Sequence, residues 1–415
     1  MPNNWKKCKL SEITTKIGSG ATPRGGKGAY KESGISLIRS QNVLNFKFSV
    51  RGLAFIDEDQ ADKLKNVIIE ENDVLLNITG DSVARVCSVP NEYLPARVNQ
   101  HVAIIRANNN QLDSDFLKFA LLEKSNKDLL LALASAGATR NAITKSMIED
   151  FELKLPPLPE QKAIANILSA IDDKIENNLA TNKTLEEMAM AFYKHWFVDF
   201  GPFQDGEFIE SELGRIPKGW EVKRLNDLAH ILNSKRVPLS TGQRSTRKGE
   251  YPYYGASGII DNIDDFIFDG EYVIISEDGE NLRSRKTPIG FSAVGKFWVN
   301  NHAHILEGIQ NGINKLIICH IAQMDMNPYL TGAVQPKLNK NNLLSIGIAM
   351  PKEDSIIQEV LSEFYSISRL IFSNEDKNQT LTKLRDTLLP KLISGEVRLK
   401  EFREQVENVI TNTVK

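Results

Sequence analysis

The stretch from Pro159 to Phe197 reads PEQKAIANILSAIDDKIENNLATNKTLEEMAMAFYKHWF, and it decides the fold of the chain. Apolar or small residues recur along it at alternating steps of three and four, and the same ladder passes through two asparagines: Ile164, Leu168, Ile171, Ile175, Asn178, Asn182, Leu185, Ala189, Phe192 and Trp196. This spacing predicts a helix whose seam packs against another helix. After Pro159 no glycine or proline interrupts the pattern, so one long helix is expected.

A second segment carries the same pattern and supplies the partner helix. Between Ser355 and Ser394 the apolar positions are Ile357, Leu361, Phe364, Ile371, Leu381, Leu384, Leu388 and Leu392. Each of the two segments follows a mixed, globular-looking stretch, so we predict a duplicated molecule built around paired helices. The polar stretch Asn177–Asn182 is where we expect an insertion to be tolerated, because little apolar seam would be lost there.

The remaining sequence repeats in the same order. The first motif, PNNWKKCKLSEI (Pro2–Ile13), returns as PKGWEVKRLNDL (Pro217–Leu228). The other pairs are NITGDS (Asn77–Ser82) with IISEDG (Ile274–Gly279), RVNQHVAII (Arg97–Ile105) with WVNNHAHIL (Trp298–Leu306), AGATRNAITK (Ala136–Lys145) with TGAVQPKLNK (Thr331–Lys340), and LKLPP (Leu153–Pro157) with IAMPK (Ile348–Lys352). An ordered repeat over nearly the whole chain predicts two copies of one unit. The divergent loops between the motifs indicate two related heads that read different things.

These boundaries divide the chain into six expected segments. They are head 1 at 1–155, a first long helix at 156–200, a linker rich in Gly, Pro and acidic residues at 201–216, head 2 at 217–350, a second long helix at 351–397, and a C-terminal tail at 398–415. The short strand-like runs and helical stretches within the heads predict mixed α/β domains.

The net charge and the cysteine content limit the classes of protein to which this chain can belong. The 415 residues carry a formal net charge of -2, whereas a protein that coats nucleic acid is usually basic, so nucleic-acid binding must be local or shared with a more basic partner. Cys8, Cys87 and Cys319 form no CxxC pair, which argues against a disulfide framework or a cysteine zinc site and fits a reducing cytoplasm. No signal peptide and no apolar run near twenty residues is present, so no membrane span is expected.

The nucleotide-site and methyltransferase motifs fail on their spacing. The loop Gly25-Gly26-Lys27-Gly28 lacks the Ser or Thr that a phosphate-binding loop needs after its lysine, and it has Thr22 where that motif needs a glycine. The run Asn327-Pro328-Tyr329 has only one of the two prolines of an adenine methyltransferase site. We therefore expect no cofactor-binding residues in this chain.

The nuclease and metal motifs are also incomplete. Asp150, Glu160 and Lys162 are the residue types of a nuclease metal site, but the second copy has no equivalent triad. His302 and His304 lack a third ligand at metal spacing, and His101 and His302 occupy equivalent strand positions that suit packing or a surface. We expect no catalytic and no metal-binding residues.

The residue types that remain to be considered are those that can recognise DNA. Arg and Lys can pair with guanine edges or phosphates, and Asn or Gln with adenine. In head 1 the candidates for DNA binding are Arg24, Lys27, Arg39, Gln41, Asn77, Arg85, Arg97, Asn99, Gln100, Arg140 and Asn141. In head 2 they are Lys235, Arg236, Arg244, Arg247, Lys248, Asn281, Arg283, Arg285, Lys286, Asn300, Asn301 and Lys337.

Four motifs carry a family resemblance. They are LPPLPEQKAIANIL (Leu155–Leu168), WFVDFGPF (Trp196–Phe203), SELGRIPKGW (Ser211–Trp220) and LLPKLISGEV (Leu388–Val397). Together with the order head, helix, head, helix, they resemble the conserved-region boundaries of the specificity subunit of type I restriction-modification systems. The resemblance covers essentially the full chain.

The resemblance implies a fold and a role. The fold would be α+β, with two homologous target-recognition domains joined by two long antiparallel helices that form a coiled-coil spacer with a pseudo-twofold repeat. Each head would read one half of a split site in double-stranded DNA. Two methyltransferase subunits would dock on the helices and supply S-adenosylmethionine and catalysis, and restriction subunits would join for cleavage. The chain itself would not be an enzyme.

Two alternatives stay open at this point. One is a stand-alone DNA methyltransferase or nuclease with duplicated domains, which would need a cofactor or metal motif. The other is an assembly scaffold that makes no DNA contact.

Overall fold

The computed structural model describes residues 2, 4–23, 25–135, 141–332 and 334–397. The chain separates into two compact units. The first contains the described parts of Met1–Glu176 and Asn378–Lys415, and the second contains Asn177–Lys377. Head 1 therefore falls in the first unit and head 2 in the second, and each unit includes a part of both long helices.

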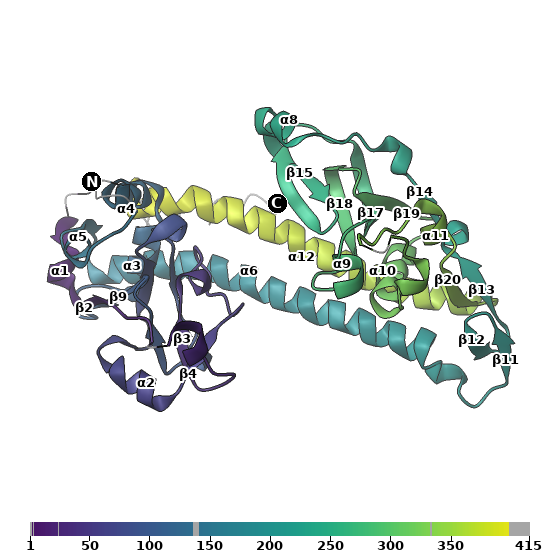
Figure 1. Cartoon of the computed structure of the whole chain (residues 1–415). Helices are drawn as coiled ribbons and strands as arrows, with labels where there is room; N and C mark the ends of the chain where they lie inside the picture. Colours follow the sequence, from purple (N-terminus) through teal and green to yellow (C-terminus); the bar gives the residue numbers. More distant parts are fainter. Residues whose placement is uncertain (1, 3, 24, 136–140, 333, 398–415) are drawn as a thin grey trace. The chain divides into compact units, whose positions relative to one another are not determined.

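Both long helices are present (Figure 1). Helix α6 (Leu158–Tyr193) has 36 residues and continues into a π-helical turn at Lys194–Val198, and helix α12 (Asp354–Ser394) has 41 residues. Pro159, the second residue of α6, suits a helix start, because the first N–H groups of a helix have no intrahelical partner. The prediction of two long helices is confirmed.

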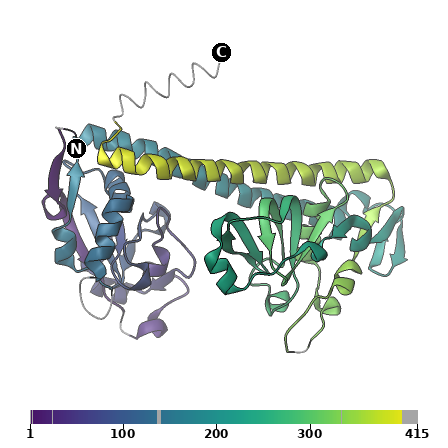
Figure 2. The same ribbon diagram turned by 90° about the horizontal axis from the view of Figure 1, so that it is seen from above.

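Within each unit the two helices run antiparallel, as Figures 1 and 2 show. In the first unit Arg385 Nη1 donates to Asp172 Oδ1 at 2.9 Å, and three residues further along α6 Asn378 Nδ2 donates to the Ile175 carbonyl at 3.4 Å. Residue numbers thus fall on α12 as they rise on α6.

The second unit repeats this pairing. Asn182 Nδ2 donates to the Ile371 carbonyl at 3.2 Å, and the rings of Phe192 and Phe364 meet edge to face with centroids 5.2 Å apart.

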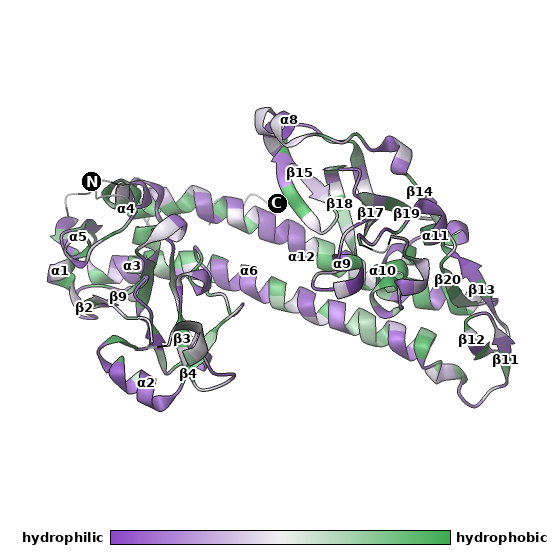
Figure 3. Ribbon diagram, in the orientation of Figure 1, coloured by the Kyte–Doolittle hydropathy of each residue, from purple (hydrophilic) through white to green (hydrophobic). Residues whose placement is uncertain are grey.

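The seam agrees with the predicted pattern except at Leu384. Figure 3 shows hydrophobic and hydrophilic residues alternating along both helices. Leu384 was predicted in the seam, but this residue is 44% exposed. Neighbouring residues on the adjacent face of α12 form the seam there. The ladder passes through Asn178 and Asn182 as predicted, since both are buried and Asn182 also accepts from Asn374 Nδ2 at 2.9 Å. An insertion at Asn177–Asn182 would therefore disturb a buried polar part of the seam, which the expectation of tolerance did not consider.

The first unit has two four-stranded sheets. One has the order β2 (Thr14–Ser19), β9 (Val102–Ala107), β6 (Val74–Asn77), β7 (Val86–Ser88), and the other β4 (Ala54–Ile56), β3 (Ile35–Ile38), β8 (Ala96–Val98), β5 (Ile68–Ile69). Successive side chains of a strand point to opposite faces. Val74 and Leu76 of β6 accordingly join the core formed with α3 (Ser114–Leu122) and the long helices, whereas Leu75 joins the core of the second sheet.

The second unit has a six-stranded sheet. Its order is β14 (Ala229–Ile231), β19 (Ala303–Gly308), β17 (Phe268–Ser276), β18 (Gly290–Val299), β15 (Lys248–Gly255), β16 (Gly258–Ile263). Val273 and Ile275 of β17 pack with α10 (Ile313–Gln323) and the long helices, and Ile274 packs on the opposite face with Phe297. The core of each head is therefore continuous with its part of the helix pair.

The duplication is confirmed by the strand order. The arrangement β2-β9-β6-β7 in the first unit returns as β14-β19-β17-β18 in the second. Antiparallel pairs formed by the ends of each head also repeat, as β1 (Lys6–Lys9) with β10 (Glu152–Leu155) and β13 (Trp220–Arg224) with β20 (Gly347–Pro351). The tryptophans at the start of each copy, Trp5 and Trp220, are both buried.

One predicted correspondence is wrong by two residues. The Ile143 N–H donates to the Ile78 carbonyl at 2.9 Å, and the Leu338 N–H donates to the Glu277 carbonyl at 2.8 Å. Ile78 therefore corresponds to Glu277, and Asn77–Ser82 correspond to 276–281 rather than to Ile274–Gly279. The strand before this turn has four residues in head 1 and nine in head 2, so the shared strand end cannot be located from its length.

Candidate nucleic-acid interface

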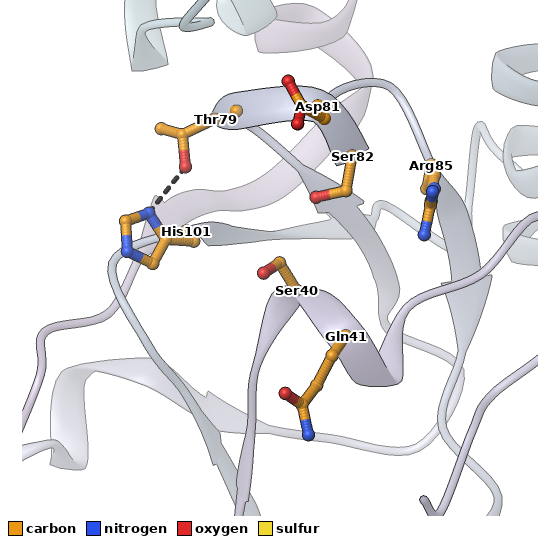
Figure 4. A pocket seen from close by; sticks show the side chains of 8 residues that line it. Ser40, Gln41, Thr79, Asp81, Ser82, Arg85 and His101 are labelled. Atoms are coloured by element: carbon orange, nitrogen blue, oxygen red, sulfur yellow. Dashed lines mark hydrogen bonds between the residues drawn. The ribbon is translucent and has the colours of Figure 1, made fainter. Parts of the chain in front are cut away.

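Head 1 contains a polar hollow of about 420 Å³ (Figure 4). It is lined by Ser40, Gln41, Thr79, Gly80, Asp81, Ser82, Arg85 and His101. Three separate turns supply these residues: the one after β3, the one after β6, and the one before β9. Side chains at strand ends are held by the sheet but remain accessible, which suits a recognition surface.

A chain of hydrogen bonds orients one wall of the hollow. The Thr22 hydroxyl donates to Gln100 Oε1, and Gln100 Nε2 donates to His101 Nε2 at 3.2 Å. His101 Nδ1 then carries the ring proton and donates to Thr79 Oγ1 at 2.6 Å. With its oxygen accepting from His101, the Thr79 hydroxyl is left to donate to a bound group.

Arg85 is the cation of this hollow. Within the described residues its guanidinium has neither a hydrogen bond nor an ion pair, although its main-chain carbonyl accepts from the Asn77 N–H at 2.9 Å. Burial lowers the pKa of Lys127, and the positive charge of Arg85 lowers it further. Lys127 is therefore a neighbouring like charge and not an acceptor for Arg85. An arginine with no internal acceptor can offer its whole donor fork to a ligand.

Three other predicted residues of head 1 are buried and bind its own backbone. Asn77 is fully buried and donates to the Ser40 carbonyl at 2.9 Å, which fixes the turn after β3. Asn99 is buried and accepts from the His101 N–H at 3.0 Å. Arg97 is buried with its Nε donating to the Ala61 carbonyl at 3.1 Å, and burial lowers its pKa. These side chains hold the protein's own backbone rather than a partner's.

The remaining predicted residues of head 1 divide by exposure. Gln41 and Gln100 are exposed, and Gln41 Nε2 donates to the Gly52 carbonyl at 3.0 Å. Arg39 also donates to the Gly52 carbonyl and lies over the Tyr30 ring at 5.1 Å. Asn141 is exposed. Arg24, Arg140 and the side chain of Lys27 lie outside the described residues.

The basic clusters of head 2 are largely paired with acidic residues of the same head. Arg236 contacts Glu277 at 2.9 Å, which also contacts Lys337 at 3.4 Å. Lys248 contacts Asp261 at 2.6 Å. Similar ion pairs join Arg244 to Asp261 at 3.4 Å and Arg247 to Asp264 at 2.9 Å. Charges neutralised in this way contribute little attraction for phosphate.

Other predicted residues of head 2 bind its backbone. Arg283 donates to the Gly332 carbonyl at 3.1 Å, and Arg285 to the Ala322 carbonyl at 2.8 Å. The Asn281 amide donates to the Thr287 carbonyl at 3.0 Å, and Asn300 Oδ1 accepts from the His302 N–H at 2.9 Å. Lys235, Lys286 and Asn301 are exposed and remain candidates for direct contact.

Sequence reasoning placed Gln41 and Arg85 among the candidates but missed five other side chains of the hollow. They are Ser40, Thr79, Asp81, Ser82 and His101. Ser, Thr and Asp occur on most surfaces, so their types carry no signal. The available signal was positional, because the motif Asn77–Ser82 recurs in both copies beside an equivalent histidine.

The described residues were compared with the requirements of a metal site and of a membrane span. Across the described residues no group of three or more His, Cys, Asp or Glu could hold a metal ion. Asp150 forms an ion pair with Lys9 at 2.8 Å, and Glu160 accepts from Trp5 Nε1 at 3.3 Å. A search of the same described part of the chain finds no helix with the length and apolar character of a bilayer span.

Comparisons with known proteins cover both copies of the repeat. A family described as "Type I restriction modification DNA specificity domain" matches residues 2–187 and 217–383. The type I restriction enzyme MjaIX specificity subunit of Methanocaldococcus jannaschii is 27% identical over 97% of this chain and 95% of its own length. The HindI specificity subunit of Haemophilus influenzae is 24% identical over 95% of this chain and 100% of its own length.

A solved structure shares the fold. The crystal structure of a type I restriction-modification system S subunit from M. genitalium aligns with a TM-score of 0.58 and 17% identity. The alignment covers 94% of this chain and 97% of that one.

Proposed function

Because the chain belongs to the type I restriction-modification DNA specificity family, we propose that it reads a split site in double-stranded DNA, one half with each head. One observation carries the proposal: the family domain matches the chain twice, once over each head, and the two heads repeat one strand order around differing loops. Two related heads with unlike loops favour an asymmetric target with two unlike half-sites.

The DNA contacts would be few and local. We infer that Gln41, Arg85, Gln100 and Asn141 serve head 1, and that Lys235, Lys286 and Asn301 serve head 2. Arg24, Lys27 and Arg140 remain proposals from the sequence. With a net charge of -2, the chain gains little from non-specific attraction.

The family match supports a proposal about the partners. We propose that two methyltransferase subunits dock on the helix pair, bind S-adenosylmethionine and catalyse methylation, that restriction subunits join for cleavage, and that this chain is not itself an enzyme. The twofold repeat supplies two similar docking surfaces, one for each methyltransferase. We place the complex in the cytoplasm, where Cys8, Cys87 and Cys319 stay reduced.

A reconstitution tests this proposal. The full chain, its methyltransferase and their complex are each incubated with S-adenosylmethionine and genomic DNA, and methylated sites are sequenced. We expect site-specific methylation only from the complex. The chain alone should bind DNA weakly, with an affinity that falls steeply as salt rises, because its few cationic contacts release counterions. Methylation by the chain alone would establish the enzyme alternative, and a complex that methylates without this chain's DNA contact would favour the scaffold.

A further inference from the structure

The turns that line the hollow of head 1 have counterparts in head 2, held by the same hydrogen bonds. The His101 N–H donates to Asn99 Oδ1 at 3.0 Å, and the His302 N–H donates to Asn300 Oδ1 at 2.9 Å. The two turns before β9 and β19 therefore have the same internal structure.

The turn opposite is tethered in the same way. The Asn99 N–H donates to the Ile38 carbonyl at 3.0 Å, and the Asn300 N–H donates to the Tyr254 carbonyl at 3.0 Å. Ile38 thus corresponds to Tyr254, and two residues further on Ser40 corresponds to Ala256. In agreement, the end of β6 donates to the Ser40 carbonyl through Asn77 Nδ2, and the end of β17 donates to the Ala256 carbonyl through Ser276 Oγ.

The third turn closes the frame. The Gly80 N–H donates to the Asn141 carbonyl at 3.1 Å, and the Gly279 N–H donates to the Pro336 carbonyl at 3.0 Å. Thr79 therefore corresponds to Asp278. We call these three turns, with their shared hydrogen bonds, the common frame.

The position of the cation is also defined by this frame. The Asn77 N–H donates to the Arg85 carbonyl at 2.9 Å, and the Ser276 N–H donates to the Ile289 carbonyl at 2.9 Å. Arg85 thus corresponds to Ile289, which is only 5% exposed and packs in the core of head 2. At this position head 2 therefore has a buried apolar side chain in place of the cation of head 1.

The hydrogen-bonding character of the frame is reversed between the heads. In head 1 Arg85 and the Thr79 hydroxyl offer donors. In head 2 Asp278 takes the place of Thr79: its Oδ2 accepts from His302 Nδ1 at 2.8 Å, its side chain is 23% exposed, and within the described residues its other oxygen has no hydrogen bond. At the positions of Thr79 and Arg85 the backbone thus presents donors in head 1, and at the position of Asp278 it presents an acceptor in head 2, while Asp81 adds a carboxylate to the lining of the head 1 hollow.

We propose that the two heads read base edges of opposite hydrogen-bonding character at equivalent positions of the common frame. Arg85 in head 1 reads an edge with two acceptors, the O6 and N7 of a guanine. Asp278 in head 2 reads an amino group, on a cytosine or an adenine. This inference rests on the proposed function and assigns the specificity residue of each head.

The test measures the recognised sequence of paired variants. The chain is reconstituted with its methyltransferase, and a DNA library with both half-sites randomised is methylated and sequenced. Arg85→Gln should reduce discrimination at one G·C pair of one half-site by roughly ten- to a hundredfold and leave the other half-site unchanged. Asp278→Asn, which keeps the side-chain shape, should reduce discrimination by a similar factor at one pair of the other half-site.

Matched controls carry the same substitutions outside the frame. Arg51→Gln changes an exposed arginine of head 1, and Asp269→Asn an exposed aspartate of head 2. Both should preserve the base preference at every position, and Arg51→Gln should at most weaken binding uniformly.

The outcomes separate this inference from the proposed function. A wild-type complex that yields no bipartite motif contradicts the proposed function itself. A normal wild-type motif overturns only the common-frame reading if Arg85→Gln or Asp278→Asn leaves discrimination intact, if both alter the same half-site, or if Arg85→Gln weakens all sequences equally as loss of a phosphate contact would.

Discussion

Leu392→Asp is expected to destroy the helix pairing of the first unit and with it assembly with the methyltransferase. The Leu392 side chain is fully buried in the core that also contains Ile164 and Leu168 of α6. Truncating a buried leucine costs about 2–5 kcal/mol. A carboxylate placed there without a partner adds the cost of lost hydration, and the sum is comparable to the whole stability of a typical domain, about 5–15 kcal/mol.

Leu384→Asp is the matched control on the same helix. Leu384 is 44% exposed, so its carboxylate stays hydrated and the free energy of unfolding should change by less than about 1 kcal/mol. Thermal unfolding of both variants and gel filtration with the methyltransferase compare them directly. Equal behaviour of the two variants, whether both assemble or both fail, would contradict the assignment of the seam.

Seven residues inserted into each long helix should widen the gap between the two half-sites by about three base pairs. An insertion of one heptad after Asn177 in α6 and another after Lys377 in α12 adds about 10 Å of helix, and a base pair occupies about 3.4 Å. Seven residues return the apolar positions to the same face, so the antiparallel pairing is preserved. The sequences of the half-sites themselves should stay unchanged.

A four-residue insertion between Asn178 and Asn182, in α6 alone, is the contrasting variant. It advances the seam by more than one helical turn and rotates it by about 40°, while α12 keeps its register. It also separates Asn178 from Asn182, which is buried and bonded to Ile371 and Asn374 of α12. Assembly and methylation should be lost. Sequenced methylation sites with an unchanged gap after the paired insertion would contradict the role of the helices as a spacer.

The sequence alone predicted the framework of this protein because the framework is periodic. A three-four ladder must bury one helix face, so both long helices could be located within a few residues. The repeat located the heads for a similar reason, since Trp5 and Trp220 fill equivalent buried positions. Leu384 was misplaced because a long helix with many apolar residues permits more than one seam, and only packing selects between them.

The recognition surface could be predicted only in part. Residue type indicated which side chains can pair with DNA, but it could not show which are already engaged. Arg97 and Arg236 have the same chemistry as Arg85, yet both bind groups of their own head. The groups that these two arginines bind lie tens of residues away in sequence. They come into contact only in the folded head. Arg85 became the strongest candidate because its guanidinium has no acceptor among the residues that the structure describes.

Exchanging one head tests whether the two heads read their half-sites independently. Residues 217–350 are replaced by the second head of a relative, the chimera is expressed with its methyltransferase, and methylated bases are mapped by single-molecule sequencing of the cell's genome. We expect one half of the recognised sequence to change completely while the other half and the gap stay the same. A chimera that assembles and methylates DNA but alters both halves, or the gap, would contradict the account of two independent heads on a shared helical spacer.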